Sequence, residues 1–230
     1  MADRKITAHT AITAAQVADT DVFELVDISD TTDAASGTNK RITALEEKKR
    51  VNVQAYSTGV TKNRFIPCAI TAAQLTTGPV TINTIRASAF IVTYPLSIDR
   101  IACEVTVGTT GKIRLGIWAD DGTGYPSTLI LDGGEQTISA PGMIGTSTSI
   151  SATLNPGLYW VGYVTDTGNT MRLGNTASYP PAVGVPSAGA SGFVHINWSV
   201  AFTYGALPNP FPAGGSATVL NQPIIFIRIV

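Results

Sequence analysis

The chain has 230 residues, with 15 basic and 16 acidic side chains and a formal net charge of −1. No basic block is longer than the three residues Lys48, Lys49 and Arg50, which argues against a nucleic-acid partner, because phosphates demand a basic face. Residues 1–10 lack the apolar core of a signal peptide, and no apolar run reaches the length of a membrane span. We therefore expect synthesis in the cytosol, without export by the usual route or membrane insertion.

The charged residues are unevenly distributed along the chain. Residues 1–50 hold 9 acidic and 7 basic side chains, which leaves 7 and 8 for residues 51–230. In ordinary globular chains about a quarter of the residues are charged. The low charge of residues 51–230 therefore predicts that part of their surface is hidden in an oligomer. The alternative is a Thr-rich, extracellular-type β surface. We expect an N-terminal module at 1–50, a linker at 51–61 and a large β-domain at 62–230.

The N-terminal module combines one strand signal with two helix signals. The apolar run of residues 23–28 predicts a strand, followed by a small polar segment that contains Gly37 and a basic step at residues 39–41. Capping boxes at residues 13–16 and 43–46 predict two short helices, because in each the hydroxyl and the Glu or Gln three residues on satisfy each other's free backbone donors.

The order of these signals resembles the N-terminal attachment segment of tailed-phage fibres and head appendages. The matching motifs are Val-Asp-x-Ser-Asp at 26–30, Ser-Gly-Thr-Asn-Lys at 36–40 and Ile-Thr-x-x-Glu at 42–46. The resemblance implies a structural protein of the virion that binds other virion proteins through this segment, after synthesis in the host cytoplasm. The implied attachment residues are Phe23, Leu25, Val26, Asp27, Ile28, Asp30, Lys40, Arg41 and Ile42.

The remainder of the chain reads as β-structure. Apolar and polar residues alternate with period two in 101–107, 112–118, 157–165, 194–202 and 223–230, which is typical of half-buried strands. Turn residues separate these runs, including Asp-Gly-Gly at 132–134. The pattern predicts an antiparallel β-sandwich or jelly roll. The loops at 174–192 and 205–217 are long, so we expect them to be functional or docked on a neighbour.

A second resemblance lies in the run IRLGIWADDGTGYP at 113–126 and the run LNPGLYW at 154–160. They are similar to β-sandwich modules of phage fibres and secreted surface proteins, which are usually structural or glycan-binding. By alternation Trp118 shares a face with Lys112 and Arg114, away from the apolar residues. An outward aromatic ring next to carboxylates can hold a sugar. The candidate glycan site is Trp118, Asp120, Asp121 and Tyr125.

Trp118 also has a structural interpretation. In a chain with so few charges, it could pack in the seam of a trimer or under a neighbouring loop. The sequence leaves both alternatives open.

Catalytic chemistry finds little support in the sequence. His195 is the one histidine of the β-domain, and Asn197 and Ser199 on the same face indicate a polar stripe rather than a Ser-His-Asp arrangement. No P-loop, His-Glu-x-x-His or Gly-x-Ser-x-Gly motif occurs. We expect neither an enzyme nor a cofactor.

The carboxylates and cysteines of the β-domain are also better explained by structural roles than by catalysis or metal binding. Most carboxylates after residue 51 sit in turns beside glycine, where Asp bonds the local backbone. Asp120, Asp121 and Asp132 could gather calcium ligands, but they lack the spacing of a dedicated loop, so we assign no metal. Cys68 and Cys103 lie in apolar sequence and are predicted to be buried thiols rather than a disulfide.

These observations together predict a homotrimeric phage fibre or appendage, anchored by its N-terminus, whose β-domain is a knob for host-surface adhesion. A capsid head fibre or decoration protein is the alternative within that class. A carbohydrate-binding module is the alternative from another class. A polysaccharide depolymerase is disfavoured because parallel β-helix repeats are missing.

Overall fold

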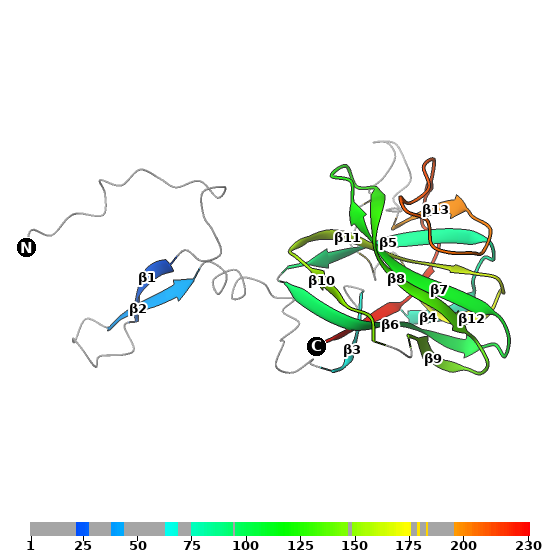
Figure 1. Cartoon of the computed structure of the whole chain (residues 1–230), viewed down its shortest axis with the longest axis horizontal. Helices are drawn as coiled ribbons and strands as arrows, with labels where there is room; N and C mark the ends of the chain where they lie inside the picture. The colour runs from blue at the N-terminus through cyan, green and yellow to red at the C-terminus, as the bar shows by residue number, and fades with distance from the viewer. Residues whose placement is uncertain are drawn as a thin grey trace, which may run out of the picture. The chain divides into compact units, whose positions relative to one another are not determined.

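The computed structural model divides the chain into two compact units, residues 1–55 (unit 1) and residues 56–230 (unit 2) (Figure 1). The structure describes residues 22–27, 38–43, 63–68, 75–93, 95–146, 149–175, 179, 183 and 196–230. Within these ranges all helical or strand elements are β-strands, and no helix that could cross a membrane is found. The prediction of a mainly β chain is confirmed. The division at 1–50, 51–61 and 62–230 stays a prediction.

The described part of unit 1 is a two-stranded antiparallel ladder. Strand β1 (Val22–Asp27) pairs with β2 (Thr38–Thr43), so that Val22 lies opposite Thr43 and Asp27 opposite Thr38. Residues 38–43 were expected to be a polar segment with a basic step before a helix that starts at Thr43, and this expectation is wrong, because they form a strand. The segment is rich in β-branched residues, which favour a strand. The predicted helices at 13–16 and beyond Thr43 lie outside the described residues.

Unit 2 contains two antiparallel sheets, in which strands distant in sequence become neighbours. The eight-stranded sheet consists of β3 (Phe65–Pro67), β4 (Leu75–Pro79), β6 (Leu96–Val107), β9 (Gly142–Gly145), β10 (Ala152–Leu154), β12 (Thr170–Gly174), β15 (Gln222–Pro223) and β16 (Ile225–Ile229). The six-stranded sheet has the order β14-β13-β5-β11-β7-β8. Its strands are β5 (Thr84–Val92), β7 (Lys112–Asp120), β8 (Pro126–Thr137), β11 (Gly157–Thr165), β13 (Asn197–Ala201) and β14 (Ser216–Thr218).

The main core lies between the two sheets and follows the period-two pattern. Ile113, Leu115 and Ile117 of β7 are buried in one cluster with apolar residues from β6 and β16 of the other sheet, including Ile101 and Ile227. Burying apolar faces against each other is the main favourable term in such a fold. The predicted antiparallel sandwich is therefore confirmed.

A second core lies on the outer face of the six-stranded sheet. Residues 202–215, which we call the strap, place the buried side chains of Leu207 and Phe211 against Trp118 and Trp160. The strap is fixed by backbone bonds at its first residue and at Phe211. Phe202 N donates to Asn83 O at 2.9 Å, and Phe211 N donates to Ser127 O at 2.8 Å. Both faces of the six-stranded sheet are thus partly covered.

The Asp-Gly-Gly segment at 132–134 was predicted as a turn, and this prediction is wrong, since it lies inside β8. Gly116 lies opposite Asp132, whereas Arg114 lies opposite Glu135, so β8 carries one extra residue. This is a β-bulge, in which Gly134 adopts a φ of 72°. The same residue types suit a turn and a bulge because both need a positive φ.

Candidate functional site

The candidate glycan site lies around the loop that joins β7 to β8. Asp120 ends β7, and its carboxylate accepts hydrogen bonds from Gly122 N at 2.7 Å and from Trp160 Nε1 at 2.8 Å. Asp121 accepts from Thr123 N at 2.7 Å and from Tyr125 N at 3.2 Å. The hydrogen bonds to Thr123 are the largest cause that lowers the pKa of Asp121. Both carboxylates therefore shape the loop, as the turn interpretation predicted.

Trp118 was expected to point outward as a stacking platform, and this expectation is wrong. Its side chain is fully buried, Nε1 donates to Pro208 O at 3.1 Å, and the ring meets Phe211 edge-on with centroids 5.4 Å apart. Alternation placed Trp118 on the correct face of β7. That face is covered by the strap, so the alternative of packing under a neighbouring loop fits the structure.

Tyr125 is half-buried in the same assembly. Its hydroxyl donates to Pro212 O at 2.6 Å and accepts from Gly215 N at 2.9 Å, so it holds two points of the strap. Its ring lies 4.8 Å from that of Trp198, tilted by 58°. The structure thus brings the predicted glycan residues together, but their rings and carboxylates serve the strap and the loop. Among the described residues they form no open stacking surface.

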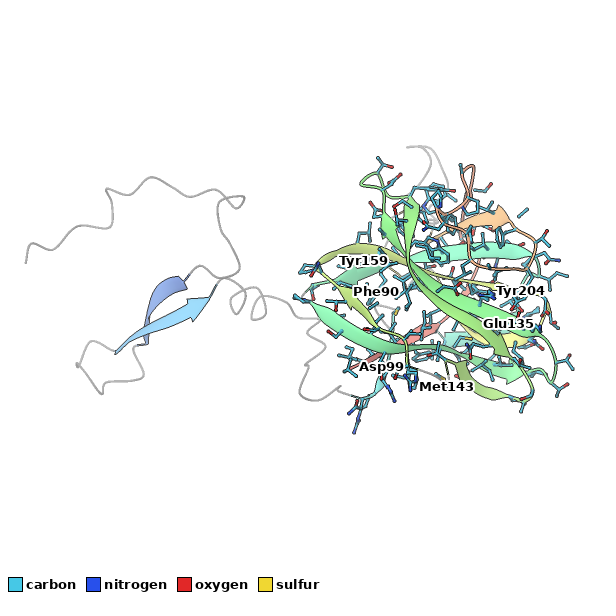
Figure 2. All side chains as sticks on the ribbon, viewed as in Figure 1. Phe90, Asp99, Glu135, Met143, Tyr159 and Tyr204 are labelled. Carbon is cyan, nitrogen blue, oxygen red and sulfur yellow. The ribbon has the colours of Figure 1, made fainter. Side chains whose placement is uncertain are left out.

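The strap also contacts a row of charged side chains on β7 and β8. Tyr204 donates its hydroxyl to Glu135 Oε2 at 3.3 Å, and the two side chains lie together in Figure 2. Glu135 also pairs with Lys112 Nζ at 2.7 Å, and Arg114 pairs with Asp132 at 3.3 Å. Burial, with a smaller contribution from the Glu135 charge, raises the pKa of Tyr204 to about 12. All these residues are partly or fully exposed, so we assign these ion pairs a structural role.

The metal hypothesis rested on Asp120, Asp121 and Asp132. Asp132 is engaged by Arg114 and accepts from Gly134 N at 2.8 Å. In the described ranges, no group of three or more His, Cys, Asp or Glu side chains is arranged to hold a metal ion. His195 lies outside those ranges.

Cys68 and Cys103 are buried free thiols, which confirms the prediction. Burial raises the pKa of both, and that of Cys103 reaches about 12. A thiol must lose its proton to act as a nucleophile. Neither cysteine is therefore a candidate for catalysis.

The predicted attachment residues fall on the two strands of unit 1. Phe23, Leu25, Val26 and Asp27 belong to β1, and Lys40, Arg41 and Ile42 belong to β2. Phe23 lies opposite Ile42, and Leu25 opposite Lys40. The ladder therefore pairs residues of the first motif, Val26 and Asp27, with residues of the second, Asn39 and Thr38. Ile28 and Asp30 lie outside the described residues.

Sequence reasoning missed the partner of the aromatic cluster, which is the strap of the same chain. The loop at 205–217 was expected to be functional or docked on a neighbour. A usable signal was the proline-rich run PNPFPAGG at 208–215, in which Phe211 is the one large apolar side chain. Such a run cannot continue a sheet, so its aromatic residue must be buried by docking.

Comparisons with known proteins place the chain in no family. No model of a known protein family and no curated protein matches it. One solved structure, of the cysteine protease and lectin-like domains of Cwp84, a surface layer associated protein of Clostridium difficile, is similar at a TM-score of 0.40 and 11% identity. The alignment covers 68% of this chain and 36% of that chain, so this chain spans little more than a third of it. A likeness at this level establishes neither family nor function.

Proposed function

We propose that the protein is a structural protein of a phage virion, a homotrimeric fibre or appendage anchored through unit 1, with unit 2 as a knob for host-surface adhesion. A capsid head fibre or decoration protein is the alternative location for the same architecture. The proposal involves no reaction. Its mechanism is attachment through unit 1 and surface contact through unit 2.

The observation that carries the proposal is the β1–β2 ladder. Its two strands contain seven of the nine residues that resemble phage attachment segments, and six residues of each strand are paired. An isolated two-stranded hairpin is marginally stable at best in water, and three or more strands or a packed face are needed for stability. A hairpin of this kind is suited to gain its stability on a partner surface, as an attachment module does.

The trimer is supported by the surface of unit 2. Residues 51–230 carry 15 charged side chains, and several large apolar side chains are exposed among the described residues: Phe65, Ile91, Val107, Met143 and Leu220. Symmetric association can cover such positions. Light scattering at micromolar concentration should give about three times the chain mass of 24.0 kDa. A clean monomer would remove this support.

The attachment step is tested by breaking the ladder in the full-length chain. Proline at both Lys40 and Arg41 removes two backbone donors of β2 and fixes φ, which is incompatible with a paired strand. The matched control K40A/R41A removes the same charges but keeps the backbone. Particles assembled without the protein are mixed with each purified variant and sedimented.

We expect the wild type and K40A/R41A to sediment with the particles, and the double proline variant to remain in the supernatant with its unit 2 folded. Binding by the proline variant contradicts attachment through the ladder. Loss of binding by the alanine variant as well indicates attachment through charge instead. Labelling the bound protein and imaging the particles then distinguishes tail from capsid.

A further inference from the structure

Arg86 is a buried cation inside the sandwich. It lies on β5, is 7% exposed, and donates from Nη2 to Thr81 Oγ1 at 2.9 Å, whereas its buried Nε has no hydrogen-bond partner. A guanidinium cannot be deprotonated in a protein, so the charge is permanent. Buried charges are normally paired, because an unpaired charge out of water is costly.

No carboxylate of unit 2 is available to Arg86. Residues 56–230 contain seven Asp and Glu side chains, all of them in the described ranges, and each is bonded elsewhere. The bonds join Asp99 to Arg228, Glu104 to Arg172, Asp120 to Trp160, Asp121 to Thr123, Asp132 to Arg114, Glu135 to Lys112, and Asp166 to the backbone of Lys112. The positive charge is therefore not balanced within the described structure.

Two further donors lie beside Arg86 on the same face of the sheet. Tyr163 is its direct cross-strand partner on β11, and Ser88 is two residues along β5. Directly opposite residues have Cβ atoms about 5 Å apart, and residues i and i+2 share a face. Tyr163 and Ser88 are fully buried. The Ser88 hydroxyl has no partner, and the Tyr163 hydroxyl meets the Arg86 guanidinium but no acceptor for its own proton. Burial raises the pKa of Tyr163 to about 12, against the opposing effect of Arg86, so the hydroxyl keeps its proton.

We propose that Arg86, Tyr163 and Ser88 form a binding site for a monatomic halide anion, with chloride as the natural occupant. A halide accepts from the Nε–H group and from both hydroxyls, offers no donor that would need an acceptor, and balances the guanidinium charge. The donor atoms are buried, which favours a monatomic ion over a sugar acid or a phosphate. Gln222, whose Nε2 donates to Val161 O at 3.1 Å, has a free buried Oε1, which as an acceptor takes no part in holding an anion.

The direct test uses the wild-type protein crystallised in sodium bromide, because bromide replaces chloride and scatters anomalously. We expect an anomalous peak within hydrogen-bond distance of Arg86 Nε and Tyr163 Oη. A solvent peak there without anomalous signal would identify water and overturn the proposal. Bromide confined to the protein surface would overturn it as well.

A solution test follows the melting temperature against chloride, with gluconate replacing chloride at constant ionic strength. An anion that binds only the folded state stabilises it in proportion to the logarithm of its concentration above Kd. For a domain of this size the melting temperature should rise by about 3 °C per tenfold increase in chloride.

The variants separate this site from general salt effects. Arg86→Met should lose the dependence on chloride, and Tyr163→Phe should shift it to higher concentration. The control Arg172→Gln, which breaks the pair with Glu104, should keep it. In gluconate the Arg86→Met protein should be at least as stable as the wild type, because the unbalanced charge is gone. A chloride dependence that persists in Arg86→Met would overturn the proposal, and the crystal test does not depend on how that variant folds.

Discussion

Replacing Trp118 with alanine should destabilise unit 2 and release the strap. The ring is fully buried between β7 and the strap, and truncating a buried Trp costs about 3–5 kcal/mol. The lost hydrogen bond to Pro208 O adds less, because Pro208 is partly exposed and water can replace the donor. A loss of about 4 kcal/mol lowers the melting temperature by roughly 8–16 °C in a domain of this size.

The assay combines melting with limited chymotrypsin digestion. The strap contains Phe202 and Tyr204, neither of which is followed by proline, so in Trp118→Ala we expect cleavage after these residues under conditions that leave the wild type intact. Phe65→Ala is a matched control, because Phe65 is an aromatic strand residue that is 42% exposed, and its truncation should cost only about 1 kcal/mol. Wild-type melting and an uncut strap in Trp118→Ala would refute the argument that Trp118 holds the strap.

Three further outcomes are expected. A shortened chain that starts near Val51 should keep the β circular dichroism and the melting behaviour of unit 2, and its aggregation would mean that the N-terminal segment belongs to the sandwich core. The hydrogen bond with Arg228 is the largest cause that lowers the pKa of Asp99, so this carboxylate contributes stability at neutral pH that is lost as the pH falls through its depressed pKa. Urea midpoints between pH 6 and about pH 2 should therefore fall more steeply for the wild type than for Asp99→Asn. Cys68 and Cys103 should resist iodoacetamide at pH 8 in the folded protein and react in urea, and labelling at equal rates in both states would contradict their burial.

β7 could be predicted because its apolar residues alternate with Lys112 and Arg114, and it extends two residues past the expected run 112–118. β11 forms over the expected run 157–165, although residues on both of its faces are buried. β5 was not recognised, because its residues are buried on both faces and Arg86 and Ser88 interrupt the apolar pattern. A strand covered on both sides need not alternate between apolar and polar residues.

The candidate site shows a different limit. Alternation correctly assigned Trp118 to the face opposite Ile117, but it could not tell whether that face meets water. Burial of Trp118 depends on the strap, which begins 84 positions later in the sequence, at residue 202. The loop at Asp120 and Asp121 was easier to interpret. Except for the hydrogen bond from Trp160, the hydrogen bonds that the two carboxylates accept come from residues at most four positions away.

The pairing of strands in the two sheets also sets how fast each unit can form. In unit 2, β5 pairs with β11 and β13, and β6 pairs with β16, so long stretches of chain must be brought together before these contacts stabilise anything. All-β domains with such distant pairings fold in roughly milliseconds to seconds. The β1–β2 ladder closes a single short connection, and hairpins form in about 1–10 μs. The β1–β2 ladder can therefore pair long before unit 2 has reached its native packing.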